Sequence, residues 1–163
     1  MPIFNAGFGQ VGPGEAPRPA PGMLQRTGPI VPLQVEIPAA LAAQMQATGA
    51  QIPTPVIGMG LIDTGASVSA VDLSVVDRLG IQPIGVVPIS HAGGSQLQQT
   101  YPARFSFPGT SLPTIDFSAL LGANLSGMLL PIPGQLIALL GRDLLKSFVL
   151  IYNGSDGRFT LCF

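Results

Sequence analysis

Asp63, Thr64 and Gly65 place a carboxylate, a hydroxyl and a residue without a side chain in direct succession. They follow the apolar stretch 52–62, in a chain in which only 9% of the residues are charged. A glycine turn after a strand can hold a carboxylate in open space, where it can activate water. The alternative is an ordinary Asp-Thr-Gly turn without chemistry, because short motifs also match by chance. These three residues leave both hypotheses open.

Three segments, in chain order, resemble motifs of the retropepsin-like aspartic proteases. Residues 62–67 (Ile-Asp-Thr-Gly-Ala-Ser) resemble the active-site loop of that family. Residues 138–145 (Ala-Leu-Leu-Gly-Arg-Asp-Leu-Leu) resemble its second signature, in which apolar residues and a glycine precede a short helix. Residues 90–95 (Ser-His-Ala-Gly-Gly-Ser) fall where the family has its flap, a glycine-tipped hairpin that closes over substrate. One motif is weak evidence, whereas three in the family's order are specific.

The resemblance implies a mostly β chain with a closed, barrel-like acid-protease (retropepsin) fold, two short helices and one lobe per chain. The composition favours the same class, because 21 Gly and 17 Pro accompany 47% hydrophobic residues, which fits short strands joined by turns. The two helices are expected at residues 72–80, with Asp72 as N-cap and Gly80 as the end, and at residues 141–148. Residues 39–50 also have the composition of a short helix.

The hydrophobic pattern predicts strands and two hairpins along the rest of the chain. Residues 84–109 are expected to form a hairpin around a glycine-rich tip, and residues 149–163 form a second one. Further strands are expected at residues 30–38, 52–62, 112–121 and 134–140. Residues 1–29 are rich in Gly and Pro and have no hydrophobic periodicity, which predicts a flexible arm. The expected organisation is therefore an arm of residues 1–29 and a protease domain of residues 30–163.

Aspartic proteolysis requires two carboxylates that share one proton. One acts as a base on water, and the other donates a proton to the carbonyl oxygen of the substrate. The chain contains one Asp-Thr-Gly. Other acidic residues lie in unsuitable places, in the arm, on the short helices or near turns: Glu15, Asp72, Asp77, Asp116, Asp143 and Asp156. The partner of Asp63 should therefore be Asp63 of a second chain, in a two-fold homodimer, as the resemblance also implies. The sequence thus predicts an aspartic endopeptidase that hydrolyses peptide bonds of a peptide or protein substrate.

The resemblance also implies roles for the residues around this dyad. Thr64 and Gly65 would brace the catalytic Asp63. The positions implied to contact substrate are Ala66 and Ser67 in the loop and His91, Ala92, Gly93 and Gly94 in the flap. The positions implied to support the loop are Leu140, Gly141, Arg142 and Asp143.

Two of these residues also have simpler interpretations. His91 can be an exposed loop residue, and Arg142 can be a solvated cation at a helix start, where the helix dipole is mildly unfavourable. Retroviral members of the family usually carry an acid at the position of Ser67, and that acid pairs with the arginine of the second motif. Arg142 of this chain therefore needs another partner.

Composition excludes several other functions. A net charge of −1 with one lysine argues against nucleic acid and anionic membranes as partners. One His and one Cys (Cys162) leave no cysteine metal cluster and no internal disulfide, and water as the nucleophile requires no metal or cofactor. Cys162 is expected to be a small buried hydrophobe in the final strand, which in the family joins the dimer sheet.

The ends and apolar stretches of the chain predict a cytoplasmic, soluble protein. The first residues lack the basic start and apolar core of a signal peptide, and the most apolar stretch, residues 118–133, is too short and broken to span a bilayer.

Two other functions remain open at this point. A catalytically silent peptide-binding or dimerisation module of the same fold could retain Asp63 while losing the geometry of the flap or cleft. A generic β domain with a chance Asp-Thr-Gly turn would be a monomer.

Overall fold

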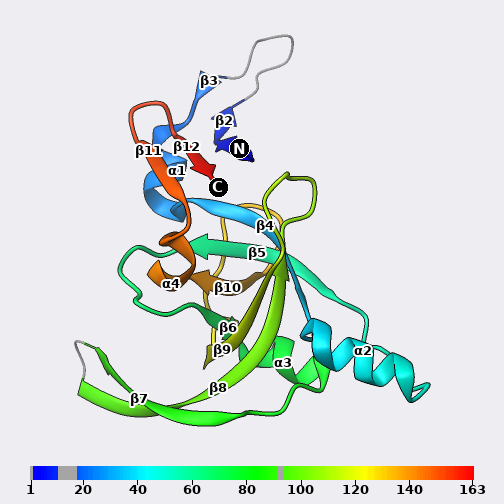
Figure 1. The fold of residues 1–163 in the computed structure, drawn as a ribbon. Helices are drawn as coiled ribbons and strands as arrows, with labels where there is room; N and C mark the ends of the chain where they lie inside the picture. The colour runs from blue at the N-terminus through cyan, green and yellow to red at the C-terminus, as the bar shows by residue number, and fades with distance from the viewer. Residues whose placement is uncertain (1, 11–17, 92–93) are drawn as a thin grey trace.

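A closed β-barrel forms the centre of the molecule (Figure 1). The computed structural model describes residues 2–10, 18–91 and 94–163. Within these residues six strands form the barrel, in the order β4 (Ile30–Glu36), β5 (Val56–Ile62), β10 (Leu136–Leu140), β6 (Ala70–Asp72), β9 (Ile115–Ala123) and β8 (Gly94–Ser106). Pairing of β8 with β4 closes it. With 45% strand and 18% helix, the predicted mostly β, barrel-like class is confirmed.

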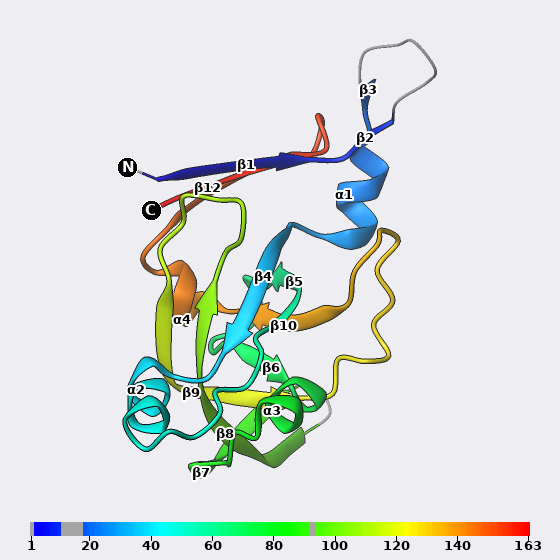
Figure 2. The ribbon, with the colours of Figure 1, turned by 90° about the vertical axis from the view of Figure 1, so that its right-hand side faces the viewer.

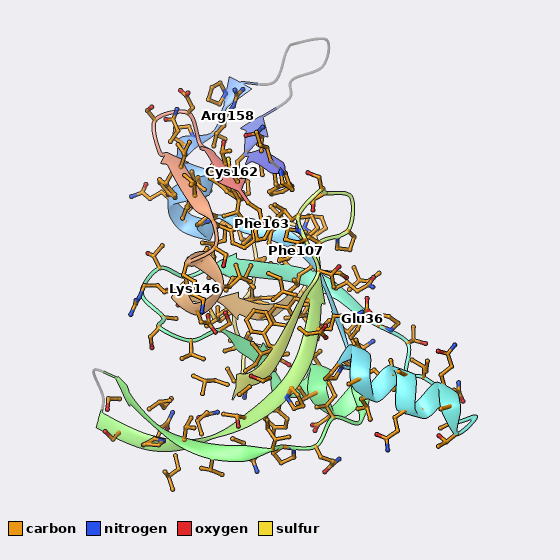
Figure 3. All side chains as sticks on the ribbon, viewed as in Figure 1. Glu36, Phe107, Lys146, Arg158, Cys162 and Phe163 are labelled. Carbon is orange, nitrogen blue, oxygen red and sulfur yellow. The ribbon has the colours of Figure 1, made fainter. Side chains whose placement is uncertain are left out.

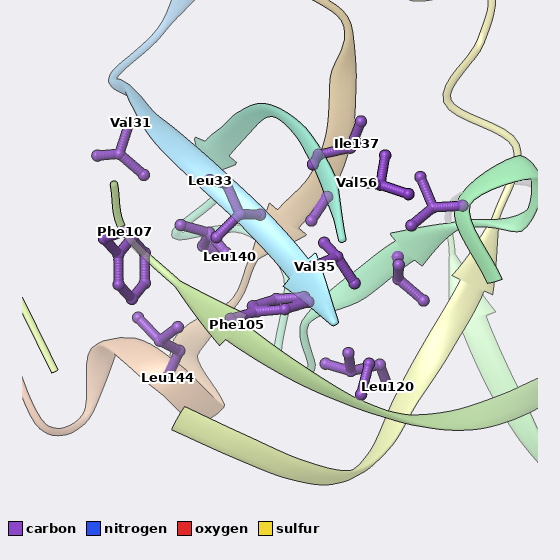
Figure 4. Close-up of a cluster of buried hydrophobic side chains, with 14 of the residues drawn as sticks. Val31, Leu33, Val35, Val56, Phe105, Phe107, Leu120, Ile137, Leu140 and Leu144 are labelled. Atoms are coloured by element: carbon purple, nitrogen blue, oxygen red, sulfur yellow. The ribbon is translucent and has the colours of Figure 1, made fainter. Parts of the chain in front are cut away.

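The barrel interior is the hydrophobic core (Figure 4). Side chains alternate between the two faces of a strand, so every second residue of β4 and β8 points inward. The buried residues of these two strands include Val31, Leu33, Val35, Tyr101, Ala103 and Phe105. Phe105 also packs against Phe117 of β9, with ring centroids 5.0 Å apart. The alternation of apolar residues in the sequence therefore identifies the side chains that point into the barrel.

Four short helices lie within the described part of the chain: α1 (Pro21–Thr27), α2 (Ala39–Ala47), α3 (Leu73–Leu79) and α4 (Arg142–Leu145). The helices expected at residues 39–50, 72–80 and 141–148 correspond to α2, α3 and α4, whereas α1 was not expected. The fold alone implied two helices, which is too few. Asp72 caps α3 as predicted, accepting a hydrogen bond from the Ser74 amide at 2.9 Å. Gly80 ends this helix in the left-handed conformation, which glycine adopts without strain.

The N-terminal residues are the main correction to the sequence-based expectation of a flexible arm. β1 (Ile3–Gly7) pairs antiparallel with β12 (Arg158–Cys162), whose other neighbour is β11 (Val149–Asn153). We call β1, β12 and β11 the terminal sheet; it lies above the barrel (Figure 2). The short strands β2 (Gly9–Gln10) and β3 (Arg18–Pro19) pair with each other, and α1 packs Leu24 into the core with 0% exposure. The expectation of an irregular arm is therefore wrong for the described residues of the segment.

The predicted glycine-tipped hairpin is present. β7 (Gly85–His91) pairs with the first half of β8, in a register that sets Ser90 opposite Ser95 and His91 opposite Gly94. The hairpin runs below the barrel in Figure 1 and leaves its apolar side chains exposed, with Leu97 at 74%. The predicted site residues Ala92 and Gly93 lie outside the described residues. Among the described residues, no helix has the length and hydropathy needed to cross a membrane.

An ion pair joins β8 and β9 on the outside of the barrel. Arg104 donates to Asp116 from Nε (3.0 Å) and Nη2 (2.7 Å), and the Ala39 amide at the start of α2 also donates to Asp116 (3.2 Å). The hydrogen bond from Arg104 lowers the pKa of Asp116 below its usual value, outweighing the opposite effect of burial. The pair therefore stabilises the fold above about pH 4, where the unfolded carboxyl is ionised, and this contribution is lost as pH falls through the lowered pKa.

We predict that Asp116→Asn lowers the free energy of unfolding at neutral pH by at most about 1 kcal/mol, because solvent screens a pair this exposed. The difference from wild type should be smaller at about pH 2 than at neutral pH, because the contribution of the ion pair is lost as the pH falls through the lowered pKa of Asp116. Urea denaturation at both pH values measures it. Asp77→Asn, a change of an exposed acid on α3, should show no such pH-dependent difference. If Asp116→Asn lowers the free energy of unfolding equally at both pH values, the ion pair does not have the predicted role.

Candidate active site

Asp63 follows directly on β5, at a point where the backbone is fixed from both sides. β10 runs parallel to β5 and pairs Leu140 with Ile62. The Asp63 amide donates to the Leu140 carbonyl (3.0 Å), and the Ile62 amide donates to the Pro29 carbonyl (2.9 Å), just before β4. Because two neighbouring strands hold its backbone, Asp63 sits on a defined edge of the barrel.

The loop that begins at Asp63 turns back on its own carboxylate. The Asp63 Oδ1 accepts hydrogen bonds from the amides of Gly65 (2.9 Å) and Ala66 (3.2 Å). A Cβ atom at position 65 would stand 3.1 Å from this oxygen, so glycine leaves the space that the turn requires. Among the described residues, only Oδ1 accepts a hydrogen bond, and the half-buried side chain leaves Oδ2 available to water or substrate. The arrangement orients a carboxylate outward.

Arg142 at the start of α4 braces this loop. Its Nη1 donates to the carbonyl oxygens of Thr64 (2.7 Å) and Gly65 (3.0 Å). Its backbone amide donates to the carbonyl of Ala66 (3.0 Å), and the next amide, that of Asp143, donates to the carbonyl of Ser67 (3.2 Å). The partners of Arg142 are therefore backbone carbonyls, because position 67 carries a serine instead of an acid. The side chain is also exposed, so Arg142 remains in contact with solvent while it braces the loop.

A buried hydrogen-bond network lies beneath the loop and involves a residue that sequence reasoning missed, Ser69. Ser69 is 0% exposed. Its hydroxyl donates to Asp143 Oδ1 (2.6 Å) and accepts from the Gly141 amide (2.9 Å), while its own amide also donates to Asp143 Oδ1 (2.9 Å). A Cβ atom at position 141 would lie 2.7 Å from the carbonyl carbon of Val68, so glycine permits this approach. The sequence offered one signal: a hydroxyl directly before the short strand β6.

The structure thus brings together two of the three predicted groups of site residues. Asp63 to Ser67 form the loop, and Leu140, Gly141, Arg142 and Asp143 support it, with Leu140 fully buried. Thr64 and Ser67 are exposed, and the bracing contact of Thr64 is made by its carbonyl rather than by its hydroxyl.

The third group, on the hairpin, lies apart from the loop. In Figure 1 the hairpin extends towards the side of the molecule where α4 and the loop after β5 lie. No hydrogen bond between the described hairpin residues and Asp63 is present. His91 and Gly94 occupy the last position of β7 and the first of β8.

Asp63 lies outside three cavities of the single chain. Three cavities, of about 610, 220 and 310 Å³, occur on the described part of the molecule, and none of these three is lined by Asp63. Nor do any three His, Cys, Asp or Glu side chains among residues 2–10, 18–91 and 94–163 come together as a possible metal site. One chain therefore supplies an oriented carboxylate, and these cavities do not surround it with a substrate cleft.

Comparison with protein-family models and with curated protein sequences gives no match to this chain.

We predict that Ser69→Ala lowers the free energy of unfolding by about 1–3 kcal/mol, because it leaves the buried Gly141 amide without a partner and removes one of the hydrogen bonds that Asp143 Oδ1 accepts. Chemical denaturation measures the loss. The matched control is Ser67→Ala in the same loop, where the side chain is exposed and the expected change is within about 0.5 kcal/mol. Equal effects of the two changes would show that the buried network does not hold the loop.

Proposed function

We propose that this protein is a retropepsin-like aspartic endopeptidase that acts as a homodimer. The observation that carries the proposal is the outward Asp63 carboxylate, fixed by two amides and braced by Arg142. The network of Ser69, Gly141 and Asp143 beneath the loop holds it in this position. The chain has one Asp-Thr-Gly, so the second carboxylate is that of a second copy.

In the proposed mechanism the two Asp63 carboxylates share one proton, because neighbouring like charges do not both ionise readily. One carboxylate takes a proton from water as its oxygen attacks the carbonyl carbon of the peptide bond. The other gives its proton to the carbonyl oxygen. Collapse of the tetrahedral intermediate breaks the C–N bond. The departing nitrogen takes up the proton that the first carboxylate removed from water, and a hydroxyl of the intermediate returns a proton to the second carboxylate.

The β7–β8 hairpin would cover the substrate. Between Arg78 and Arg104 the sequence contains no Asp, Glu, Lys or Arg, and exposed apolar side chains such as Val86 and Leu97 lie on this hairpin. A strand-like peptide can bind such a surface through backbone hydrogen bonds and apolar side-chain contacts. The expected substrate is therefore an extended peptide segment with few charges.

The decisive test is Asp63→Asn, which keeps the size of the side chain but removes the base. We expect the rate of cleavage of a peptide library to fall at least about 100-fold, the usual scale of a lost general base. Asp77→Asn, in which an exposed acid is changed in the same way, is the control and should cleave like wild type. Unchanged cleavage by Asp63→Asn overturns the assignment, and saturable peptide binding without turnover by wild type identifies a silent module instead.

Mixing the two proteins tests whether the site is shared between chains. With free exchange of subunits, adding an equal amount of the Asp63→Asn chain to wild type should roughly halve the activity, because mixed dimers carry only one of the two carboxylates. If each chain acted alone, the activity after the addition would equal the activity of the wild-type protein before it.

A further inference from the structure

The outer face of the terminal sheet carries a polar hollow that the proposed function does not use. Alternate residues of a strand share one face of a sheet, and so do residues directly opposite each other on neighbouring strands. On the face towards the barrel, Phe159 and Leu161 of β12 are buried. The outer face carries two rows of residues across the three strands: Asn5, Thr160 and Ile151 in one row, and Gly7, Arg158 and Asn153 in the other.

A cavity of about 610 Å³ lies over these two rows. Residues of the short strands β2 and β3 and of the turn between β11 and β12 form its walls, and these segments lie together in Figure 1. Backbone hydrogen bonds fix the walls, because the Phe8 amide donates to the Gly157 carbonyl (3.0 Å) and the Ala20 amide donates to the Phe8 carbonyl (2.9 Å). The hollow is therefore preformed and has the volume of a small-molecule site.

Arg158 lines this hollow and has no ion-pair partner among the described residues. Figure 3 shows Arg158 at the end of the terminal sheet nearest β3, with Cys162 at the other end. Gly7, directly opposite Arg158, has no side chain, and a Cβ atom there would stand 2.7 Å from Arg158 Cγ. The stem of Arg158 therefore leans over β1, across the space that the glycine leaves.

Other polar groups line the same hollow. Asp156 Oδ2 accepts a hydrogen bond from the Asn153 side-chain amide (2.8 Å), and no described group donates to Asp156 Oδ1. The Thr160 hydroxyl donates to Asn5 Oδ1 (2.6 Å), which leaves the side-chain NH₂ of Asn5 as a donor. Arg158 and Asp156 do not pair with each other, although both line the hollow. A molecule in the hollow therefore meets a cation and an anion at two separate places.

We infer that this hollow binds a short peptide whose two ends are both free. The peptide carboxylate pairs with the Arg158 guanidinium, whose parallel N–H donors match the geometry of a carboxylate. The peptide ammonium group lies against Asp156, and an apolar side chain of the peptide contacts Ile151 and Phe8. Asp156 disfavours a purely anionic ligand and Arg158 a purely cationic one. Opposite charges at the two ends of one small molecule satisfy both.

The inference does not rest on the proposed function, because Asp63 does not line this hollow. The two proposals are nevertheless compatible. Hydrolysis of a peptide bond creates one new carboxylate and one new ammonium group, so short products of the proposed endopeptidase would carry the chemistry that the hollow selects.

The test is calorimetric titration of the full chain with the dipeptide Ala-Leu. We expect saturable binding that Arg158→Gln weakens at least about 10-fold, because a hydrogen-bonded pair of charges is lost. Arg78→Gln, which changes an exposed arginine on α3, is the matched control and should bind like wild type. Circular dichroism shows that both variants remain folded.

Altered peptides test each end of the ligand without changing the protein. The amide of Ala-Leu lacks the carboxylate, and N-acetyl-Ala-Leu lacks the ammonium group, so each should bind at least about 10-fold more weakly than Ala-Leu. Arg158→Gln should not weaken binding of the amide further, and Asp156→Asn should not weaken binding of the acetylated peptide further. In each case the peptide already lacks the group that the changed residue contacts.

Two results overturn the inference: no binding of Ala-Leu to wild type at up to about 10 mM, or binding by Arg158→Gln that equals that of wild type. If N-acetyl-Ala-Leu binds as tightly as Ala-Leu, the hollow takes the carboxyl end of a longer chain, and the assignment to short peptides is wrong. None of these results affects the proposed function, because cleavage by wild type and Asp63→Asn is measured separately.

Discussion

The parallel pairing of β10 with β5 sets the two motifs of the candidate site side by side. Leu140 lies opposite Ile62, so the residues that follow each strand, Gly141 and Asp63, leave the barrel at the same edge. Without this register Arg142 could not reach the carbonyls of the Asp63 loop, and Asp143 could not reach Ser69. The pairing joins segments that lie almost eighty residues apart in the sequence, as the 78-residue separation of Arg142 and Thr64 illustrates. The rest of the site depends on this one alignment.

This arrangement also requires that Gly141, which follows β10, lies close to the residues that precede β6. Gly141 has room for no side chain because the backbone of Val68 and Ser69 lies against it. Ser69 then replaces the water that the Gly141 amide would otherwise require, and Asp143 accepts both the hydroxyl and the amide of Ser69. Buried polar networks of this kind specify one arrangement when every member has a partner. The loop is thus held by backbone geometry and a satisfied network rather than by an ion pair.

Features with a local signal were predictable from the sequence. Alternating apolar residues predicted the barrel strands, the Gly-rich tip predicted the β7–β8 hairpin, and Asp72 with Gly80 predicted α3, because each signal depends on neighbouring residues. Features that join distant segments were not predictable. The strand β1 pairs with β12, where Asn5 and Thr160 are 155 residues apart, and a Gly-rich segment shows no periodicity that would reveal it.

The partners of Arg142 were hidden for another reason: they are main-chain carbonyls, which every residue carries, so no side-chain pattern marks them.

The single carboxylate is the physical problem that the proposed function poses to a lone chain. One Asp63 lacks the second carboxylate that the proposed chemistry requires. If a second copy supplies it, stability and activity are linked through the same equilibrium, because a partner that binds only the folded chain stabilises it by mass action. Under the proposed function, dilution should therefore lower both the activity and the stability of the chain.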